Sequence, residues 1–226
     1  MVDRPIIFSA PMVRAILDGR KTQTRRIIMP QPSQPFCGIS TDGVKWWTND
    51  DDTGVIEPLR VPYAVGDLLW VREACALWMN PEGKVVLPPD GDGPAYRASM
   101  TDTEWRALRH DQRVMAGIAC GATERSTGNW VVRSPRFMPR WASRISLKVT
   151  GVRVQRLQEI SEGDAQSEGA RPAFTRTSIP DYPVTSTPSY RWGFEELWAS
   201  IHGPGSWEEN SWVAAISFRR VSHDHA

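Results

Sequence analysis

The sequence predicts a mixed α+β fold in which a β-barrel carries peripheral helices. Three observations support this prediction. The segments with strand character are separated by long excursions and not by regular βα units, no internal repeat is visible, and 40% of the 226 residues are hydrophobic, which is enough to form a core. A barrel therefore fits the sequence better than a doubly wound sheet.

The N-terminal elements follow from local signals. Residues 6–8 are a short apolar run suited to a first strand. A helix is expected to begin at Pro11 and to end at Gly19, because proline is tolerated in the first turn and glycine favours the position after the last. A polar, basic loop should follow. Residues 30–62 are rich in Pro, Gly, Asn and Asp and indicate a long loop or loose hairpin, whereas residues 65–73 indicate a turn and a buried strand.

The C-terminal half is expected to supply two strands, at residues 144–154 and 212–218, and two helices, at residues 161–169 and 190–201. Residues 78–134 are dense in Pro, Gly and charge and indicate a loop-rich insertion, with one helix at 101–113. Residues 172–189 read as an exposed loop and 222–226 as a flexible tail. The chain is thus expected to form one domain, 1–226, with an insertion.

The charge is balanced overall but segregated along the chain. The 27 basic and 26 acidic side chains give a formal net charge of +1. Residues 1–30 carry six basic and two acidic side chains, and residues 129–150 carry five basic side chains and no acid. This segregation is what an anion-binding face on a neutral protein requires.

Composition also limits the cofactors and the compartment. Cys37, Cys75 and Cys120 are widely spaced and lack the CxxC pattern, so neither a disulfide framework nor a metal site is expected, and no cofactor is predicted. The N-terminus lacks the apolar segment of a signal peptide, and no apolar run is long enough to span a membrane. We therefore expect a cytoplasmic protein without a membrane partner.

Residues 19–26 concentrate cations and hydroxyls directly after the first helix, and the candidate binding or catalytic residues there are Arg20, Lys21, Thr22, Thr24, Arg25 and Arg26. Two interpretations are open. The segment could be a solvated basic loop, which is the usual role of a charge run. Alternatively, its cations and hydroxyls could bind phosphate, and a lysine beside other cations has a depressed pKa and can act as a base.

The same segment carries a resemblance to a known family. Residues 16–25 resemble the signature of ASCH domains, which share a barrel of the PUA-like superfamily. The similarity continues at 65–73, 145–154 and 160–169 and in the closing aromatic strand, whereas the middle insertion is unmatched. The long form also resembles proteins common in bacteriophages and prophages. The resemblance implies a PUA-like β-barrel in a bacterial or phage-infected cytoplasm.

The resemblance also implies a chemistry. A bacterial family member that removes the acetyl group from acetylated cytidine is thought to use a lysine, a threonine and a glutamate, which correspond here to Lys21, Thr24 and Glu168. Lys21 would deprotonate Thr24 or a water molecule, the oxygen would attack an amide carbonyl, and Glu168 would carry a proton to the leaving amine. Arg20 or backbone N–H groups would stabilise the oxyanion.

Glu73 is a further candidate, because it ends the strand of residues 65–73. It could form a surface ion pair with the neighbouring Arg72. Alternatively, it could be a second acid in a pocket, since strand ends often border sites.

Residues 133–144 interleave arginines with aromatic residues and contain no acid, and the candidates for binding are Arg136, Arg140, Trp141 and Arg144. Arginines and aromatic faces together suit single-stranded nucleic acid, in which phosphates and bases are both accessible. The other interpretation is a proline-bent loop whose aromatic side chains cover the core.

Three functions remain open. The chain could be an amidohydrolase acting on an acylated cytidine, a binding module for RNA or DNA without catalysis, or a ribonuclease in which Lys21 and Arg25 stabilise a phosphorane. The partner is accordingly RNA, DNA or a modified nucleoside. Glu168 separates these functions, because a carboxylate beside a phosphate site is repulsive whereas hydrolysis of an amide needs it.

Overall fold

The computed structural model describes residues 1–32, 36–39, 46–49, 56–80, 84–85, 94–106, 129–174 and 187–221. The chain forms two compact units, each assembled from separate stretches of sequence. The first unit comprises Met1–Val2, Ala15–Leu68 and Leu147–Arg220, and the second comprises Asp3–Arg14, Leu69–Ser146 and Val221–Ala226.

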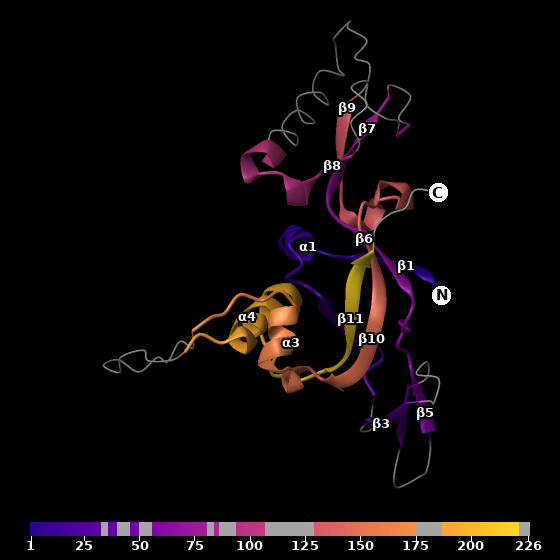
Figure 1. The fold of residues 1–226 in the computed structure, drawn as a ribbon, viewed down its shortest axis with the longest axis vertical. Helices are drawn as coiled ribbons and strands as arrows, with labels where there is room; N and C mark the ends of the chain where they lie inside the picture. Colours follow the sequence, from indigo (N-terminus) through magenta and orange to yellow (C-terminus); the bar gives the residue numbers. More distant parts are fainter. Residues whose placement is uncertain are drawn as a thin grey trace, which may run out of the picture. The chain divides into compact units, whose positions relative to one another are not determined.

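Five strands form the main sheet, in the order β1 (Asp3–Ile7), β6 (Leu68–Arg72), β10 (Ser146–Arg156), β11 (Trp212–Val221) and β2 (Gln23–Ile27). The sheet is mixed. The Leu68 N–H donates to the Val2 carbonyl and the Phe8 N–H to the Arg72 carbonyl, so β1 and β6 run parallel, whereas β11 and β2 are antiparallel. Figure 1 shows β10 and β11 as the long central pair.

The predicted mixed α+β class is therefore confirmed, but the described strands do not form a closed barrel. Strands β1 and β2 stand at the two ends of the strand order, and neither pairs with the other in the part of the chain that the structure describes. The sheet is open because its two edge strands each have one neighbour only.

The core of the first unit lies between helices and sheet. Helix α3 (Glu162–Ser167) and helix α4 (Tyr190–His202) pack together (Figure 1), and the helices predicted at 161–169 and 190–201 are confirmed. The buried cluster consists of Leu157, Ile160, Ala165, Ala170, Phe194, Trp198, Trp207 and Val213.

The basic segment after helix α1 (Ala10–Leu17) is not a solvated loop. Gly19 has a φ of 74°, as expected of the residue that follows a helix, but the chain then enters β2. Thr24 pairs with Ile216 of β11. The expected loop is thus corrected to a strand, because half of the basic segment hydrogen-bonds to a partner far away in the sequence.

Residues 30–62 contain more order than the expected loop. Strands β3 (Phe36–Ile39), β4 (Trp46–Asn49) and β5 (Ile56–Leu59) form a three-stranded antiparallel sheet in that order. The loose-hairpin alternative is therefore the one that the backbone supports.

The second unit contains another three-stranded sheet, with β7 (Cys75–Met79) between β8 (Ala95–Tyr96) and β9 (Asn129–Arg133). The 3-10 turns η1 (Arg97–Ser99), η2 (Pro135–Phe137) and η3 (Arg140–Ala142) accompany it. Both ends of the predicted insertion 78–134 are thus paired strands and not loops.

Several predictions fall partly or wholly outside the described residues. Only residues 101–106 of the helix expected at 101–113 are described, and 102–106 are helical. Residues 175–186 of the loop and the tail 222–226 also lie outside. Within the described ranges, no helix is both long and apolar enough to cross a membrane.

Candidate active site

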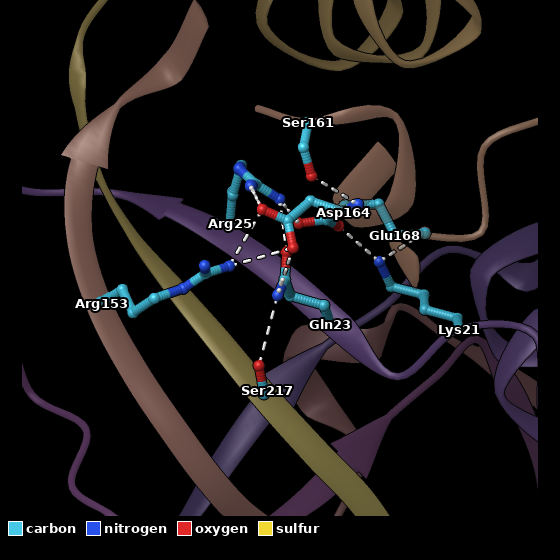
Figure 2. A network of polar contacts seen from close by, with 8 residues as sticks. All are labelled: Lys21, Gln23, Arg25, Arg153, Ser161, Asp164, Glu168 and Ser217. Carbon is cyan, nitrogen blue, oxygen red and sulfur yellow. Dashed lines mark hydrogen bonds and ion pairs between the residues drawn. The ribbon is translucent and has the colours of Figure 1, made fainter. Parts of the chain in front are cut away.

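A polar cluster in the first unit joins strand β2 to helix α3, and Figure 2 shows its side chains converging. Alternation along β2 directs Gln23 and Arg25 to the same face of the sheet. Asp164 and Glu168 are four residues apart, so they share one side of α3. Ser161 caps that helix by accepting a hydrogen bond of 3.1 Å from the Asp164 N–H.

Lys21 lies at the centre of this cluster. Its backbone N–H donates to the Ala15 carbonyl at 2.9 Å, which holds the residue against the end of α1. Its Nζ donates to Glu168 Oε2 at 2.7 Å and to the Glu168 carbonyl at 2.8 Å. The Lys21 side chain is 0% exposed and that of Glu168 is 4% exposed, so the pair is buried.

Arg25 is the second cation of the cluster. One guanidinium nitrogen lies 3.0 Å from Glu168 Oε1, and the other lies 3.2 Å from Asp164 Oδ2. The guanidinium carbon of Arg25 lies over the ring of Phe194 in α4, 5.7 Å from the ring centroid. Glu168 therefore bridges two buried cations, with one oxygen on each.

Asp164 connects the cluster to the surface. Arg153, whose side chain is 55% exposed, reaches both oxygens of Asp164 at 2.9 and 3.0 Å. Gln23 donates to Asp164 at 3.3 Å and to Ser217 at 3.2 Å. Desolvation on its own would raise the pKa of Asp164, but Arg153, with Arg25 and Gln23, holds it below its ordinary value.

The pKa of Lys21 is lowered. Burial is the largest cause, because it penalises the ammonium form, and the neighbouring Arg26 and Arg25 lower the pKa further. Glu168 opposes this effect by charge and by its hydrogen bond, but does not cancel it. A lysine in this environment releases its proton more easily than one at the surface, and it can then act as a base.

A pocket of about 220 Å³ is lined by Arg20, Gln166, Gly169, Ala170, Arg171, Pro172 and Tyr190, and neither Lys21 nor Glu168 is part of this lining. Arg20 and Gly169 are the sequence neighbours of Lys21 and Glu168. Gly169 has a φ of 79°, and a Cβ there would meet the Lys21 Cβ at 3.2 Å. Glycine at this position therefore lets the pocket wall approach Lys21 closely.

Helix α4 holds the opposite wall of the pocket. A Cβ at Gly193 would overlap the Arg171 carbonyl oxygen, so the wall segment lies directly on the helix backbone. Ala173 and Ser189 pair in an isolated antiparallel bridge. Glu162 of α3 accepts a hydrogen bond of 2.8 Å from the Tyr190 N–H at the start of α4. The wall is thus fixed to both helices.

The structure separates the other predicted residues of the basic segment from Lys21. Thr24 is buried, at 2% exposed, but strand alternation directs its side chain to the face of β2 opposite Arg25. Thr22 is exposed, and Arg20 pairs with Asp18 at 2.9 Å near the surface. Lys21, Arg25 and Glu168 are therefore the predicted residues that come together.

Glu73 belongs to the second unit and is not part of this cluster. It is 1% exposed and holds Arg144 through two contacts of 2.9 and 3.1 Å, so the expected surface ion pair with Arg72 is corrected to a buried pair with Arg144. The guanidinium carbon of Arg144 also lies 4.0 Å above the Tyr96 ring. Burial, more than any nearby charge, raises the pKa of Tyr96 to about 12.

Sequence reasoning missed the polar residues that complete the cluster, namely Gln23, Arg153, Asp164 and Ser217. Two signals could have found the inward-facing ones. Gln23 alternates with Arg25 along the strand, and Asp164 precedes Glu168 by one helical turn. In the described part of the chain, no group of three His, Cys, Asp or Glu side chains could hold a metal ion.

Fold and site together define a mixed α+β protein with a buried lysine–glutamate–arginine cluster beside a pocket. Comparison of the chain with protein-family models, with curated proteins and with solved structures found no match.

Proposed function

We propose that the chain is an amidohydrolase that removes an acyl group from a modified cytidine, with Lys21 as the base and Glu168 as the proton carrier. The observation that carries this proposal is the buried contact of 2.7 Å between Lys21 Nζ and Glu168 Oε2. A buried base and a carboxylate within hydrogen-bond reach are what general acid–base catalysis of amide hydrolysis needs.

The reaction requires one water molecule. Once Lys21 is neutral, its amine takes a proton from the water. The water oxygen attacks the acyl carbon, and the carbon–nitrogen bond then breaks. Lys21 passes the proton to Glu168 across their hydrogen bond, Glu168 donates it to the leaving amine, and the products are a carboxylic acid and cytidine. The direction of the Thr24 side chain favours water over the Thr24 hydroxyl as the nucleophile.

The pocket supports a substrate of nucleoside size. Its volume is about 220 Å³, and Arg20 in its lining is the candidate for stabilising the oxyanion. Tyr190 offers an aromatic surface for a base in the same lining.

The same contacts argue against phosphoryl chemistry. Lys21 and Arg25 would both be needed to stabilise a phosphorane, but each is already paired with a carboxylate. Glu168 between them would repel a phosphate. The cluster therefore favours an amide over a phosphodiester.

Membership of the ASCH family, with its PUA-like fold, and a cytoplasmic location are part of this proposal. The motif at residues 16–25 supports the family, and the contact between Lys21 and Glu168 joins two residues that the resemblance pairs.

The test is hydrolysis of acetylated cytidine by the full chain, with cytidine and acetate measured by chromatography. Lys21→Met and Glu168→Gln should each lower the rate by about 100-fold or more, because each removes a proton-transfer group. Activity of the wild-type chain should rise with pH and level off below the ordinary lysine pKa of 10.5, since only the unprotonated amine is a base.

Glu73→Gln is the matched control, because it makes the same change at a buried carboxylate in the second unit and should retain activity. Near-UV circular dichroism at the assay temperature establishes that each variant is folded. Lys21→Arg, which keeps a positive charge but holds its proton, should be inactive at every pH. A folded wild-type chain that releases no cytidine, or a folded Lys21→Met variant with unchanged rate, would overturn the proposal.

A further inference from the structure

Two large aromatic side chains of the second unit face solvent on consecutive turns. Phe137, at the end of η2, is 69% exposed, and Trp141, within η3, is 57% exposed. Exposed apolar surface of this size is unfavourable in water, and tryptophan and phenylalanine usually contribute their area to a core. The expectation that these aromatic residues cover the core is thus wrong.

The segment that carries them is anchored. Met138 and Ala142, each directly after an exposed aromatic residue, are 1% exposed and pack with Cys75 and Leu77. The Met138 N–H donates to the Pro135 carbonyl at 3.2 Å, which closes η2. The two aromatic rings are therefore held outward by a packed support and not by fraying.

Arg136 and Arg140 each come directly before one of the two exposed aromatic residues. The guanidinium carbons of Arg72 and Arg140 lie 4.6 and 5.6 Å from the centroid of the Trp70 ring. The ion pair between Arg140 Nε and Asp3, at 3.0 Å, uses one edge of the guanidinium, and both side chains are more than 40% exposed, at 43% and 46%. Arg136 is exposed next to Phe137.

Residues 129–150 carry more positive charge than the acids paired with them, Asp3 and Glu73, neutralise. Residues 129–150 contain five basic side chains and no acid. Arg144 is paired with Glu73, and its side chain is only 28% exposed, so we do not count it among the residues that contact a ligand. The residues available to a ligand are thus Arg136, Phe137, Arg140 and Trp141.

We propose that Arg136, Phe137, Arg140 and Trp141 form a surface that binds single-stranded nucleic acid. Bases stack on Phe137 and Trp141, and the phosphates between them contact the two arginines. A duplex keeps its base faces in its own stack, so it offers only phosphates to this surface. Residues 129–150 carry five basic side chains, of which Arg140 and Arg144 are paired with Asp3 and Glu73, and the remaining excess of positive charge favours a polyanion over a protein partner, whose interface carries both signs. This surface does not depend on the hydrolysis proposed for the first unit.

The experiment measures binding of fluorescently labelled oligothymidylate and oligouridylate to the full chain by anisotropy. Phe137→Ala and Trp141→Ala should each weaken binding by roughly 5- to 150-fold, the range for loss of one stacked base. Arg136→Gln should lower the slope of log Kd against log salt concentration by about 0.7. A duplex of equal length should bind more weakly than the single strands and should not respond to Trp141→Ala.

Matched controls come from the first unit. Phe174 is 55% exposed, so Phe174→Ala removes an exposed aromatic residue, and Arg220→Gln removes an exposed arginine. Both should bind as the wild type does. The proposal is overturned if no single strand binds at low salt, if the Phe137→Ala/Trp141→Ala double variant binds like the wild type, or if the duplex binds as tightly as the single strands. Capture of an acidic protein without any oligonucleotide binding would assign the surface to a protein partner instead.

Discussion

Glu168 in the first unit and Glu73 in the second are both buried carboxylates, 4% and 1% exposed, and each is held by an arginine. They differ in the rest of their surroundings. Glu168 also contacts Lys21, and both of its cations have side chains that are 0% exposed. Glu73 has one cation, Arg144, whose side chain is 28% exposed.

The difference concerns the mobility of protons. Arginine keeps its proton at every pH at which a protein folds, whereas a buried lysine can lose it. The arginine beside Glu73 can therefore stabilise the fold but cannot act as a base. Of the two clusters, the one at Glu168 combines a lysine, which can act as a base, with a carboxylate that could transfer its proton. Burial alone therefore does not distinguish the two carboxylates, whereas the chemical type of the neighbouring cation does.

Glu168→Gln should give the largest loss of stability. The substitution removes the carboxylate that Lys21 and Arg25 share, and the side chains of both cations are 0% exposed. A buried charge that loses its partner costs about 3–5 kcal/mol. The free energy of unfolding, measured by urea denaturation, should fall by that amount. A loss below about 1 kcal/mol would contradict the burial of the cluster.

Glu73→Gln makes the same change in the second unit and should cost less, about 1–3 kcal/mol. Arg144 is partly exposed, so water replaces some of the lost contact, and Ser99 still accepts a hydrogen bond of 2.8 Å from it. The same denaturation series measures both variants. Equal losses would mean that the second cation at Glu168 adds nothing.

A third prediction compares the Glu168 and Glu73 clusters by the pH dependence of the free energy of unfolding. The folded pKa of Lys21 lies below 10.5, so between those two values the unfolded chain binds more protons than the folded one. The free energy of unfolding of the wild type should therefore rise with pH in this window relative to Lys21→Met, by at most about 1.4 kcal/mol per pH unit.

Arg144→Met supplies the control for that measurement, because arginine does not titrate there and its removal should leave no comparable difference in slope. The raised pKa values of Tyr96 and Cys75 affect the wild type and Lys21→Met alike. A Lys21→Met curve that stays parallel to the wild-type curve up to pH 10.5 would show that Lys21 keeps its ordinary pKa.

Arg153→Gln should have the smallest effect. Arg153 pairs with Asp164 at 2.9 Å, but its side chain is 55% exposed, and exposed ion pairs contribute about 1 kcal/mol or less. Thermal unfolding should shift only slightly. A loss as large as that of Glu168→Gln would place Arg153 within the buried cluster and not at its edge.

Local signals predicted the helices well and the sheet poorly. The end of the first helix at Gly19 follows from a short-range signal, and the structure confirms it. Strand order and closure depend on pairings between distant residues, which periodicity does not encode. A closed barrel was therefore predicted where the described strands form an open sheet.

The candidate site shows the same limit. The contact between Lys21 and Glu168 spans 147 positions of sequence, and only the family resemblance suggested it. The charge of residues 19–26 indicated a solvated loop, yet Lys21 and Arg25 are 2% and 3% exposed. Cations can be buried in this way only where carboxylates from another element meet them, and a single chain read in order does not reveal those partners.

Gly193 has a consequence for variation in the pocket. It is not among the residues that line the pocket, but any side chain there would collide with the Arg171 carbonyl and push the lining outward. Because Ala173 is bridged to Ser189 just before α4, the lining cannot shift without moving the helix. A screen for variants that accept a larger acyl group should therefore find substitutions in helix α4 as well as among the residues that line the pocket.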